Sequence, residues 1–477
     1  MINLIRNELK KITKKKVIYI MFFVTLAFMI LINVINKKFQ EESYVIYDEE
    51  TVAYYKEQMT PELEASDPDY YAECKAMYES YELGKNYEDD SWQRQVISQR
   101  IQPLLKEMFL EKSGEEYEKT KEEYDKAVKA LENDDWKSFV QNDLEETNSQ
   151  IELMSEDEEQ LEHLKDMKQT LEWRLEKNIS YNNSDLNSYL QLWISARECN
   201  RQFKNNKNVQ YTDKYIHQKD VATEAIAKYA IEHNIDGTIS SQGNDNMQYG
   251  LSYNAKSQLF NVFSDYSLFI IILIVIVAGT IVSEEFNKGT IKLLLVRPYS
   301  RIKILLSKYI TCLIVLICSF IAVTLMQTVI GGIVFGFDSY KNPTVVYNFA
   351  TNSLNTVSMI ETVITMALAI LPKFILLMTL AFTLSTVLTN SPVAIAIPLL
   401  GSMVEQIINQ LAIIYEKASF LKYFVTPNWD FSQYLYGALP QMKGITFKFS
   451  ICICLAYFIV MMALSMWNFK KKNIKNI

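Results

Sequence analysis

The sequence has few of the residues that build soluble catalytic or metal sites. It contains three histidines, His163, His217 and His233, which lack metal-ligand spacing and form no His-Glu-x-x-His pattern. There is no Gly-x-Ser-x-Gly nucleophile motif, and the one Gly-Lys pair, Gly84-Lys85, lacks the flanking residues of a phosphate-binding loop. We therefore expect no metal site, no catalytic residues, no bound cofactor and no nucleotide hydrolysis by this chain itself.

Cysteine, proline and glycine are also scarce, at 6, 10 and 13 of 477 residues. Four cysteines lie in long apolar runs, where they act as small apolar side chains. Only Cys74 and Cys199 lie elsewhere, so no disulfide framework is expected, and whether these two pair is left open.

Six apolar runs are long enough to cross a hydrocarbon core of roughly 30 Å, which takes about 20 residues per helix. The first follows a basic start, as a signal peptide would, but it is too long for one and no small-residue cleavage pattern precedes Lys37. Pro372 and Lys373 interrupt the fourth run and leave room for a short interfacial helix before the span proper. The runs are residues 17–35, 266–283, 309–330, 360–388, 393–414 and 449–467.

Charge is divided unevenly along the chain. Residues 37–262 carry 47 acidic and 26 basic side chains, whereas the remainder carries 9 acidic and 22 basic ones. These remaining basic residues flank apolar runs, which argues against nucleic acid as a partner. They collect in residues 1–16, 284–308 and 470–475, and cytoplasmic flanks of spans are enriched in Lys and Arg. Both termini are therefore expected in the cytoplasm and residues 37–262 outside it.

The predicted fold is an all-α membrane protein with six transmembrane helices and a large, mostly helical extracytoplasmic insert between helices 1 and 2. Low Gly and Pro content and apolar steps of three, four and seven residues favour long amphipathic helices or a short coiled coil in the insert. Its acidic runs either attract cationic ligands or form a solvated helix face. The expected divisions are 1–16 (interfacial helix), 17–35 (first span), 37–262 (helical domain), 263–468 (spans 2–6, with a cytoplasmic loop at 284–308) and 469–477 (basic tail).

Two short amphipathic helices are expected at the cytoplasmic side. In the first, apolar side chains recur at helical spacing in residues 2–12, and Lys10, Lys11, Lys14 and Lys15 are placed to meet anionic lipid. In the second, Gly289 and Pro298 bracket a helix with one apolar face, which either lies in lipid headgroups or docks on a soluble partner.

The loop after the second span resembles that of ABC-2 type permeases, the membrane subunits of ATP-binding-cassette exporters. The family shows an acidic residue at the end of span 2, then Gly-Thr, a Leu-rich stretch, Pro, and Ser-Arg leading into a Lys. The matching positions here are Glu284, Gly289, Thr290, Leu293 to Leu295, Pro298, Ser300, Arg301 and Lys308. With the spans, the resemblance covers about half the chain. The large insert departs from the simplest members and is similar to that of bacitracin-resistance, lantibiotic-immunity and sodium-efflux permeases.

The resemblance implies a permease of the bacterial plasma membrane that works with two copies of an ATPase subunit and a second permease, identical or not. ATP and Mg would be bound by the ATPase, and the cargo would be an antimicrobial peptide or a lipid. The loop 284–308 would be a coupling helix; the alternative is an ordinary basic loop. Coupling would involve Glu284, Glu285, Gly289, Thr290, Leu294, Pro298, Ser300 and Arg301.

Polar side chains within the fifth span are a second candidate site, because ionisable groups are expensive in a membrane. Glu405, Gln406 and Asn409 could line a translocation path or a dimer interface; a snorkelling group near the outer surface is the alternative. The aromatic segment 420–436 suits the outer membrane interface, and the resemblance implies short helices that dip back into the membrane. The rival function is a non-transporting scaffold or receptor that binds partners through the insert.

Overall fold

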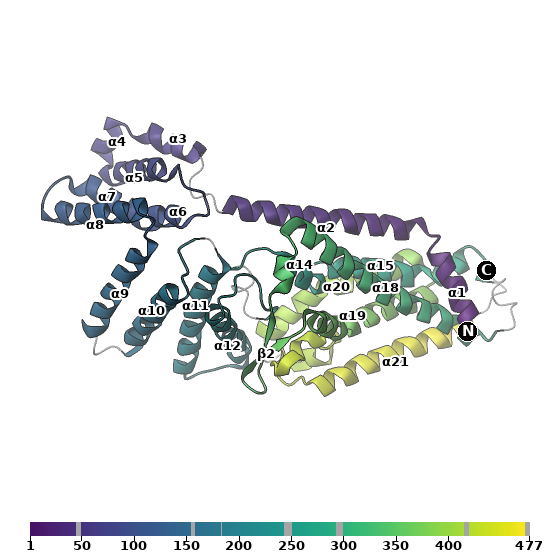
Figure 1. The fold of residues 1–477 in the computed structure, drawn as a ribbon. Coiled ribbons are helices and arrows are strands. Elements are labelled where there is room, and N and C mark those ends of the chain that lie inside the picture. Colours follow the sequence, from purple (N-terminus) through teal and green to yellow (C-terminus); the bar gives the residue numbers. More distant parts are fainter. Residues whose placement is uncertain are drawn as a thin grey trace.

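The computed structural model describes residues 1–43, 49–153, 158–182, 184–242, 250–291, 299–414 and 419–472. These residues form a bundle of long apolar helices and a helical domain (residues 49–242) beyond one end of it (Figure 1). The N-terminus and the end of the described chain lie together at the opposite end of the bundle. The expectation of a mainly helical protein is therefore confirmed.

Six helical stretches of the described chain are long and apolar enough to cross a membrane, which confirms the six predicted spans. The bundle begins with α1 (Ile2–Ile12), which precedes the first span and lies at the end of the bundle that holds both termini (Figure 1). The other helices of the bundle are α2 (Lys16–Ser43), α14 (Ala255–Phe260), η2 (Asn261–Phe263), α15 (Ser267–Thr280), α16 (Ser283–Asn287), α18 (Arg301–Phe335), α19 (Met359–Val387), α20 (Ser391–Ile414) and α21 (Phe447–Lys471).

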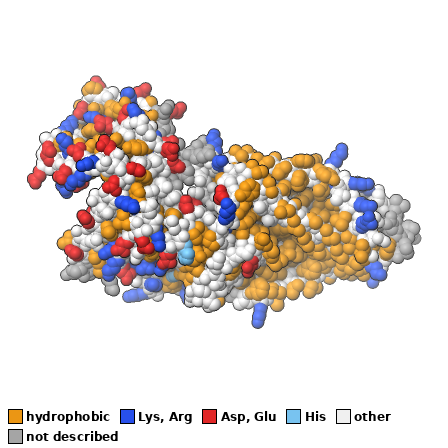
Figure 2. Space-filling model, in the orientation of Figure 1, with side chains coloured by type: hydrophobic (Ala, Val, Ile, Leu, Met, Phe, Trp, Pro, Cys, Tyr) orange, Lys and Arg blue, Asp and Glu red, His pale blue; other side chains and the backbone are white. Residues whose placement is uncertain are grey.

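The second span, from α14 to α16, is the centre of the bundle. In its most apolar window 72 % of the residues are buried, against 17 % in the first span and 17 % in the fifth. α15 packs on α18, α19 and α20, and its side chains Ile274, Val275 and Ala278 are buried. The exposed apolar side chains of the other spans form the broad hydrophobic band in Figure 2, which matches the surface expected against lipid.

Two helix boundaries differ from the sequence-based expectation. α18 begins at Arg301, so Lys308 lies inside this helix rather than at the end of the loop 284–308. α19 runs unbroken through Pro372, so the short separate helix before the fourth span is not formed. A proline removes one backbone donor, and the packing of α19 on α15 and α21 keeps the helix continuous past this defect.

The helical domain has two cores. Trp92, Ile97 and Phe139 belong to the first core, and Trp193 and Ile226 belong to the second. The unpaired thiols of Cys74 and Cys199 lie in α5 and α11, so these residues form no disulfide. The helices are α3 (Glu49–Gln58), α4 (Pro61–Ser66), α5 (Pro68–Gly84), α6 (Trp92–Val96), η1 (Ile97–Ile101), α7 (Gln102–Glu111), α8 (Glu115–Glu132), α9 (Trp136–Leu153), α10 (Glu158–Glu176), α11 (Asp185–Asn205) and α12 (Tyr211–Glu232).

A β-hairpin that the sequence analysis did not anticipate fastens the helical domain to the bundle. After η3 (Asp338–Lys341), β1 (Thr344–Asn348) and β2 (Ser353–Val357) pair antiparallel between α18 and α19. Val345 and Tyr347 enter the second core of the domain. The Val345 N–H also donates to the carbonyl of Ile239 at 2.7 Å, which extends the pairing into the domain.

The connection between α20 and α21 lies at the same end of the bundle as the hairpin. It contains three short 3₁₀ helices, η4 (Ser419–Tyr423), η5 (Thr426–Asn428) and η6 (Phe431–Gly437). η5 packs against α20 and α21, and η6 packs against α19 and β1. This connection therefore contacts both the spans and the hairpin that carries the helical domain.

Candidate functional site

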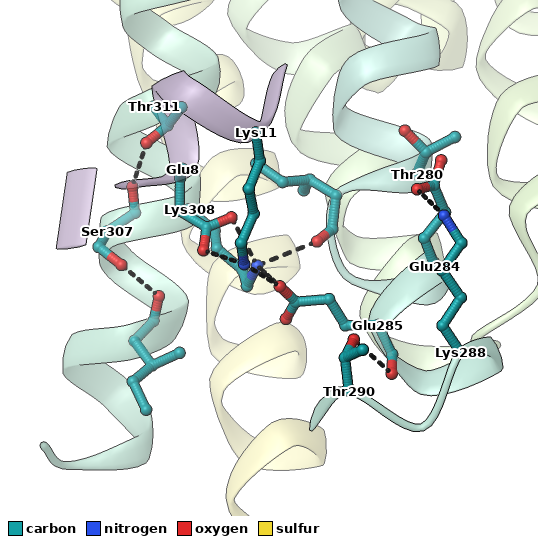
Figure 3. Close-up of polar contacts among 12 residues, drawn as sticks. Glu8, Lys11, Thr280, Glu284, Glu285, Lys288, Thr290, Ser307, Lys308 and Thr311 are labelled. Atoms are coloured by element: carbon teal, nitrogen blue, oxygen red, sulfur yellow. Dashed lines mark hydrogen bonds and ion pairs between the residues drawn. The ribbon is translucent and has the colours of Figure 1, made fainter. Parts of the chain in front are cut away.

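Four charged side chains form a closed ring of ion pairs at the end of the bundle that holds the termini. We call Glu8, Lys11, Glu285 and Lys308 the charge ring (Figure 3). Lys11 Nζ lies 2.9 Å from Glu8 and 2.7 Å from Glu285. Lys308 Nζ lies 2.8 Å from Glu8 and 2.9 Å from Glu285. Each ammonium group thus bridges the same two carboxylates.

Three separate helices supply the ring. Glu8 lies between Leu4 and Ile12 at four-residue steps, so all three side chains share the buried face of α1. Glu285 lies on α16, the short continuation of the central span. Lys308 lies on the second turn of α18 and is fully buried. The ring therefore ties the N-terminal helix to the ends of spans 2 and 3.

The buried ammonium group of Lys308 has a partner for each of its protons. Besides the two carboxylates it donates to the carbonyl of Ile281 at 3.2 Å. Burial by itself would raise the pKa of Glu8, but Lys308 and Lys11 outweigh it and hold that pKa below its ordinary value. Burial of Lys11 would lower its pKa, whereas its bonds to Glu285 and Glu8 raise it above the ordinary value. Both ring members on α1 are therefore stabilised in their charged forms.

A second ion pair lies beside the ring. Lys15 donates to Glu284 at 2.9 Å and to the Thr280 hydroxyl at 3.0 Å. Glu284 also lies 3.3 Å from Lys288, which is exposed. Glu284 and Glu285, predicted as contacts to a partner protein, are thus bound by lysines of the same chain.

The other residues predicted to couple the chain to an ATPase lie in different local surroundings. Gly289 has a left-handed φ of +68°, and the Thr290 hydroxyl donates to the Glu285 carbonyl at 3.4 Å. The Ser300 hydroxyl caps the start of α18 by accepting from the Lys303 N–H. Arg301 donates to the carbonyls of Lys470 and Lys472 at the end of α21. Leu294 and Pro298 lie outside the described residues.

The ring was not predicted as a site, although one signal for it exists in the sequence. Glu8 is the only acidic residue in the first 16 positions, and it lies on the apolar face of an otherwise basic helix. The lysines expected to meet anionic lipid lie in two different surroundings. Lys11 and Lys15 are engaged in ion pairs, whereas Arg6, Lys10 and Lys14 form an exposed stripe at four-residue spacing.

The second predicted site, in α20, divides between buried and exposed groups. Glu405 is buried, lies 2.6 Å from Lys373 on α19, and accepts a hydrogen bond from Trp429 Nε1 at 2.6 Å. Gln406 is exposed on the bundle surface, and the half-buried Asn409 has an Oδ1 atom without a hydrogen-bond partner. Glu405 is therefore held within the chain, and Gln406 is free to face lipid or another subunit.

The chemistry of both clusters is that of charge pairing. Neither combines a nucleophile with a base, and no three His, Cys, Asp or Glu side chains in the described part of the chain gather as ligands for a metal. The ring joins three helices, and separating them would leave buried charges unpaired. A movement of one of these helices should therefore be passed on to the other two.

The ring predicts a large loss of stability when one member is removed. We expect Lys308→Met to lower the free energy of unfolding in detergent by about 3–5 kcal/mol, because it leaves two carboxylates to one ammonium group. Lys303→Met, at an exposed position of the same helix, is the control and should change it by about 0.5 kcal/mol or less. Equal effects of the two substitutions in a denaturation series would contradict the ring as a structural tie.

The lowered pKa of Glu8 predicts a pH dependence. Because the pKa in the folded state lies below the ordinary 4.5, the carboxylate contributes stability above that pH and loses it as the pH falls further. The stability difference between the wild type and Glu8→Gln should therefore be constant at neutral pH and shrink only below pH 4.5. A wild type that instead gains stability relative to Glu8→Gln as the pH falls from 7 to 5 in thermal melts would show that burial dominates and raises this pKa.

The chain was compared with known proteins. The family described as "Protein of unknown function (DUF2705)" matches residues 233–475, from the end of the helical domain through the last five spans. Uncharacterized protein YhcI of Bacillus subtilis is 31 % identical over 306 residues, which cover 61 % of this chain and 90 % of that protein. Uncharacterized membrane protein YdbK of the same species is 29 % identical over 205 residues, 43 % of this chain and 77 % of that protein.

No solved structure matches the chain. The family match nevertheless covers half of the chain, and it contains Glu285 and Lys308 of the charge ring and the Lys373–Glu405 pair. Together with the six apolar helices, these matches identify the chain as a membrane protein that belongs to the DUF2705 family.

Proposed function

We propose that this chain is the permease subunit of an ATP-binding-cassette exporter of the ABC-2 type. The proposal rests on the loop resemblance, on the six spans, and on the way in which the chain attaches this loop to the bundle. A separate ATPase supplies the energy and binds ATP and Mg, and the coupling segment 284–308 passes the resulting movement to the spans. One ATPase copy serves each of two permease subunits.

The charge ring is the observation that carries this proposal. A partner that pushes on residues 288–303 moves α16, and the ring forces α1 and α18 to move with it. An ordinary basic loop needs no such buried connection to two other helices. The ring thus converts a local displacement into movement of the first and third spans, as coupling to an ATPase requires.

The proposed docking surface for the ATPase consists of exposed side chains outside the charge ring. Glu284 and Glu285 already form ion pairs with lysines of this chain, so we assign contact with the ATPase to the exposed side chains that flank residues 292–298. These groups are Lys288, Thr290, Tyr299, Ile302 and Lys303. Leu294 and Pro298 belong to this surface by the sequence resemblance.

Orientation follows from the distribution of charge. The free cations Arg6, Lys10, Lys14, Lys303 and Lys470 surround the end of the bundle that holds both termini, and basic flanks mark the cytoplasmic side. This end then faces the cytoplasm, and the helical domain lies outside the plasma membrane. Figure 2 shows basic side chains at this end of the hydrophobic band and a mixed, strongly acidic surface on the domain.

The proposed cargo is a cationic peptide antibiotic or a lipid. An acidic helical domain outside the membrane suits a cationic peptide antibiotic, and a wide lipid-facing bundle suits a lipid; export of either fits the family resemblance. The exposed face of α20 that carries Gln406 is the proposed contact to a second permease, whether an identical chain or a related one.

The proposal predicts recovery of an ATPase when the tagged chain is purified in mild detergent. Leu294→Asp and Lys303→Glu should each remove most of the co-purifying ATPase activity. The first puts a negative charge in place of an apolar contact, and the second reverses a positive charge of the docking surface. Lys443→Glu, the same reversal at an exposed position at the other end of the bundle, is the matched control and should retain the activity. Arg301 is a poorer probe, because it also holds the end of α21.

Recovery of the chain without any ATPase, together with partners that depend on the helical domain, would contradict the permease proposal. That outcome would favour a scaffold or receptor that uses the domain to bind other proteins.

A further inference from the structure

The connection between α20 and α21 is attached at both of its ends. We call residues 426–441 the strap. At one end, within the spans, Trp429 Nε1 donates to Glu405 at 2.6 Å, and Glu405 is paired with Lys373. Trp429 and Glu405 are 4 % and 6 % exposed, so this end of the strap is anchored by a buried charge.

The other end of the strap is bound to the helical domain. The side-chain amide of Gln218 on α12 accepts from the Leu439 N–H at 2.6 Å and donates to the Leu439 carbonyl at 3.0 Å. The Tyr211 hydroxyl, at the start of α12, donates to the Pro440 carbonyl at 2.7 Å. These two hydrogen bonds between the Gln218 amide and the backbone of Leu439 fix the position of the strap along α12.

The strap contains strained backbone, and buried polar atoms without a hydrogen-bond partner lie in it and beside it. Tyr436 has a left-handed φ of +56°, which is costly for a bulky residue, and the neighbouring Gly437, at +78°, approaches Ala350 too closely to accept a Cβ. Thr426 Oγ1 in the strap and Asn409 Oδ1 on α20 are buried without a hydrogen-bond partner. Strain and unpaired polar atoms lower the cost of leaving this arrangement.

The anchor of the strap contains a buried ion pair. Such a pair contributes little net stability compared with apolar side chains of the same volume, because both charges are desolvated. Loss of one partner is nevertheless costly, because the other charge is then buried and unpaired. Neutralising Glu405 should therefore weaken the arrangement that accepts the Trp429 hydrogen bond.

We propose that the strap couples the helical domain to the spans, so that displacement of α12 breaks the hydrogen bond from Trp429 to Glu405 and lifts the strap from α20 and α21. In the permease, on whose function this interpretation rests, the event opens the end of the bundle next to the domain. The movement itself needs no ATPase, so it can be measured in the isolated chain.

A native cysteine reports the position of the strap. Cys454 on α21 is buried, and its thiol donates to the carbonyl of Asn428 in the strap at 3.3 Å. The side chain of Asn428 also accepts a hydrogen bond from Ser450 on α21 at 2.7 Å, which holds the strap against this helix. A strap that lifts away therefore uncovers Cys454. Cys312, buried on α18, reports loosening of the whole bundle instead.

The experiment measures the rate at which a maleimide labels Cys454 as the single cysteine of the full chain in detergent. Glu405→Gln in the spans and Gln218→Ala in the domain should each raise the rate about tenfold, since labelling of a buried thiol follows the population of the open state. The charge exchange Lys373→Glu with Glu405→Lys restores the ion pair but leaves the Trp429 N–H facing an ammonium group, so the rate should stay high. Asp265→Asn just before α15 in span 2 and Gln202→Ala on α11, both exposed, are the matched controls and should leave it unchanged.

Three results would overturn the proposal. An unchanged rate in Glu405→Gln would mean that the ion pair does not hold the strap. A faster rate in Glu405→Gln with no change in Gln218→Ala would mean that the strap is not coupled to α12. Equal acceleration at Cys312, as the single cysteine, would mean general unfolding. Failure to find an ATPase partner changes none of these outcomes, so this proposal and the proposed function fail independently.

Discussion

The structure depends on a ring of four alternating charges at one end of an apolar bundle. Glu8, Glu285 and Lys308 are buried, and each would be costly there alone; Lys11 is half exposed and completes the ring, in which every charge touches two of opposite sign. The members come from α1, α16 and α18, so the contacts that offset the cost of burial also fix the N-terminal helix across the ends of spans 2 and 3. The positions of α1, α16 and the start of α18 relative to one another follow from this arrangement.

Two charged clusters join the helices of the bundle. At the end that holds both termini, the charge ring links the segment proposed to meet an ATPase to the first three spans. Half way along α19, the Lys373–Glu405 pair links α19, α20 and the strap, which in turn holds α12. In the bundle, α18, α19 and α20 pack on the central α15.

The sequence predicted the parts of this fold that depend on local composition. Apolar runs of about 20 residues identified all six spans, because a hydrocarbon core sets their length whatever the tertiary contacts. The charge ring could not be predicted in this way, since Glu8 and Lys308 are 300 residues apart and both occur in segments that look merely basic. The sequence analysis named Glu405 as a candidate site residue and Lys373 as a break in the fourth apolar run. It could not predict their ion pair, because sequence spacing does not show which residues of different helices are in contact. The hairpin of β1 and β2 was missed because its strands are short and β1 packs into the core of the helical domain.

The proposal requires the charge ring to lie on the cytoplasmic side of the membrane and the helical domain to lie outside. Cys199 on α11 is an exposed native thiol of the helical domain, and Lys14 on the exposed stripe at the other end can be replaced by cysteine. Each would be the single cysteine of a chain expressed in intact cells and treated with a membrane-impermeant maleimide. We expect Cys199 to be labelled directly and Lys14→Cys to be labelled only after the cells are permeabilised. Labelling of Lys14→Cys in intact cells, with Cys199 protected, would place the charge ring outside and contradict the account.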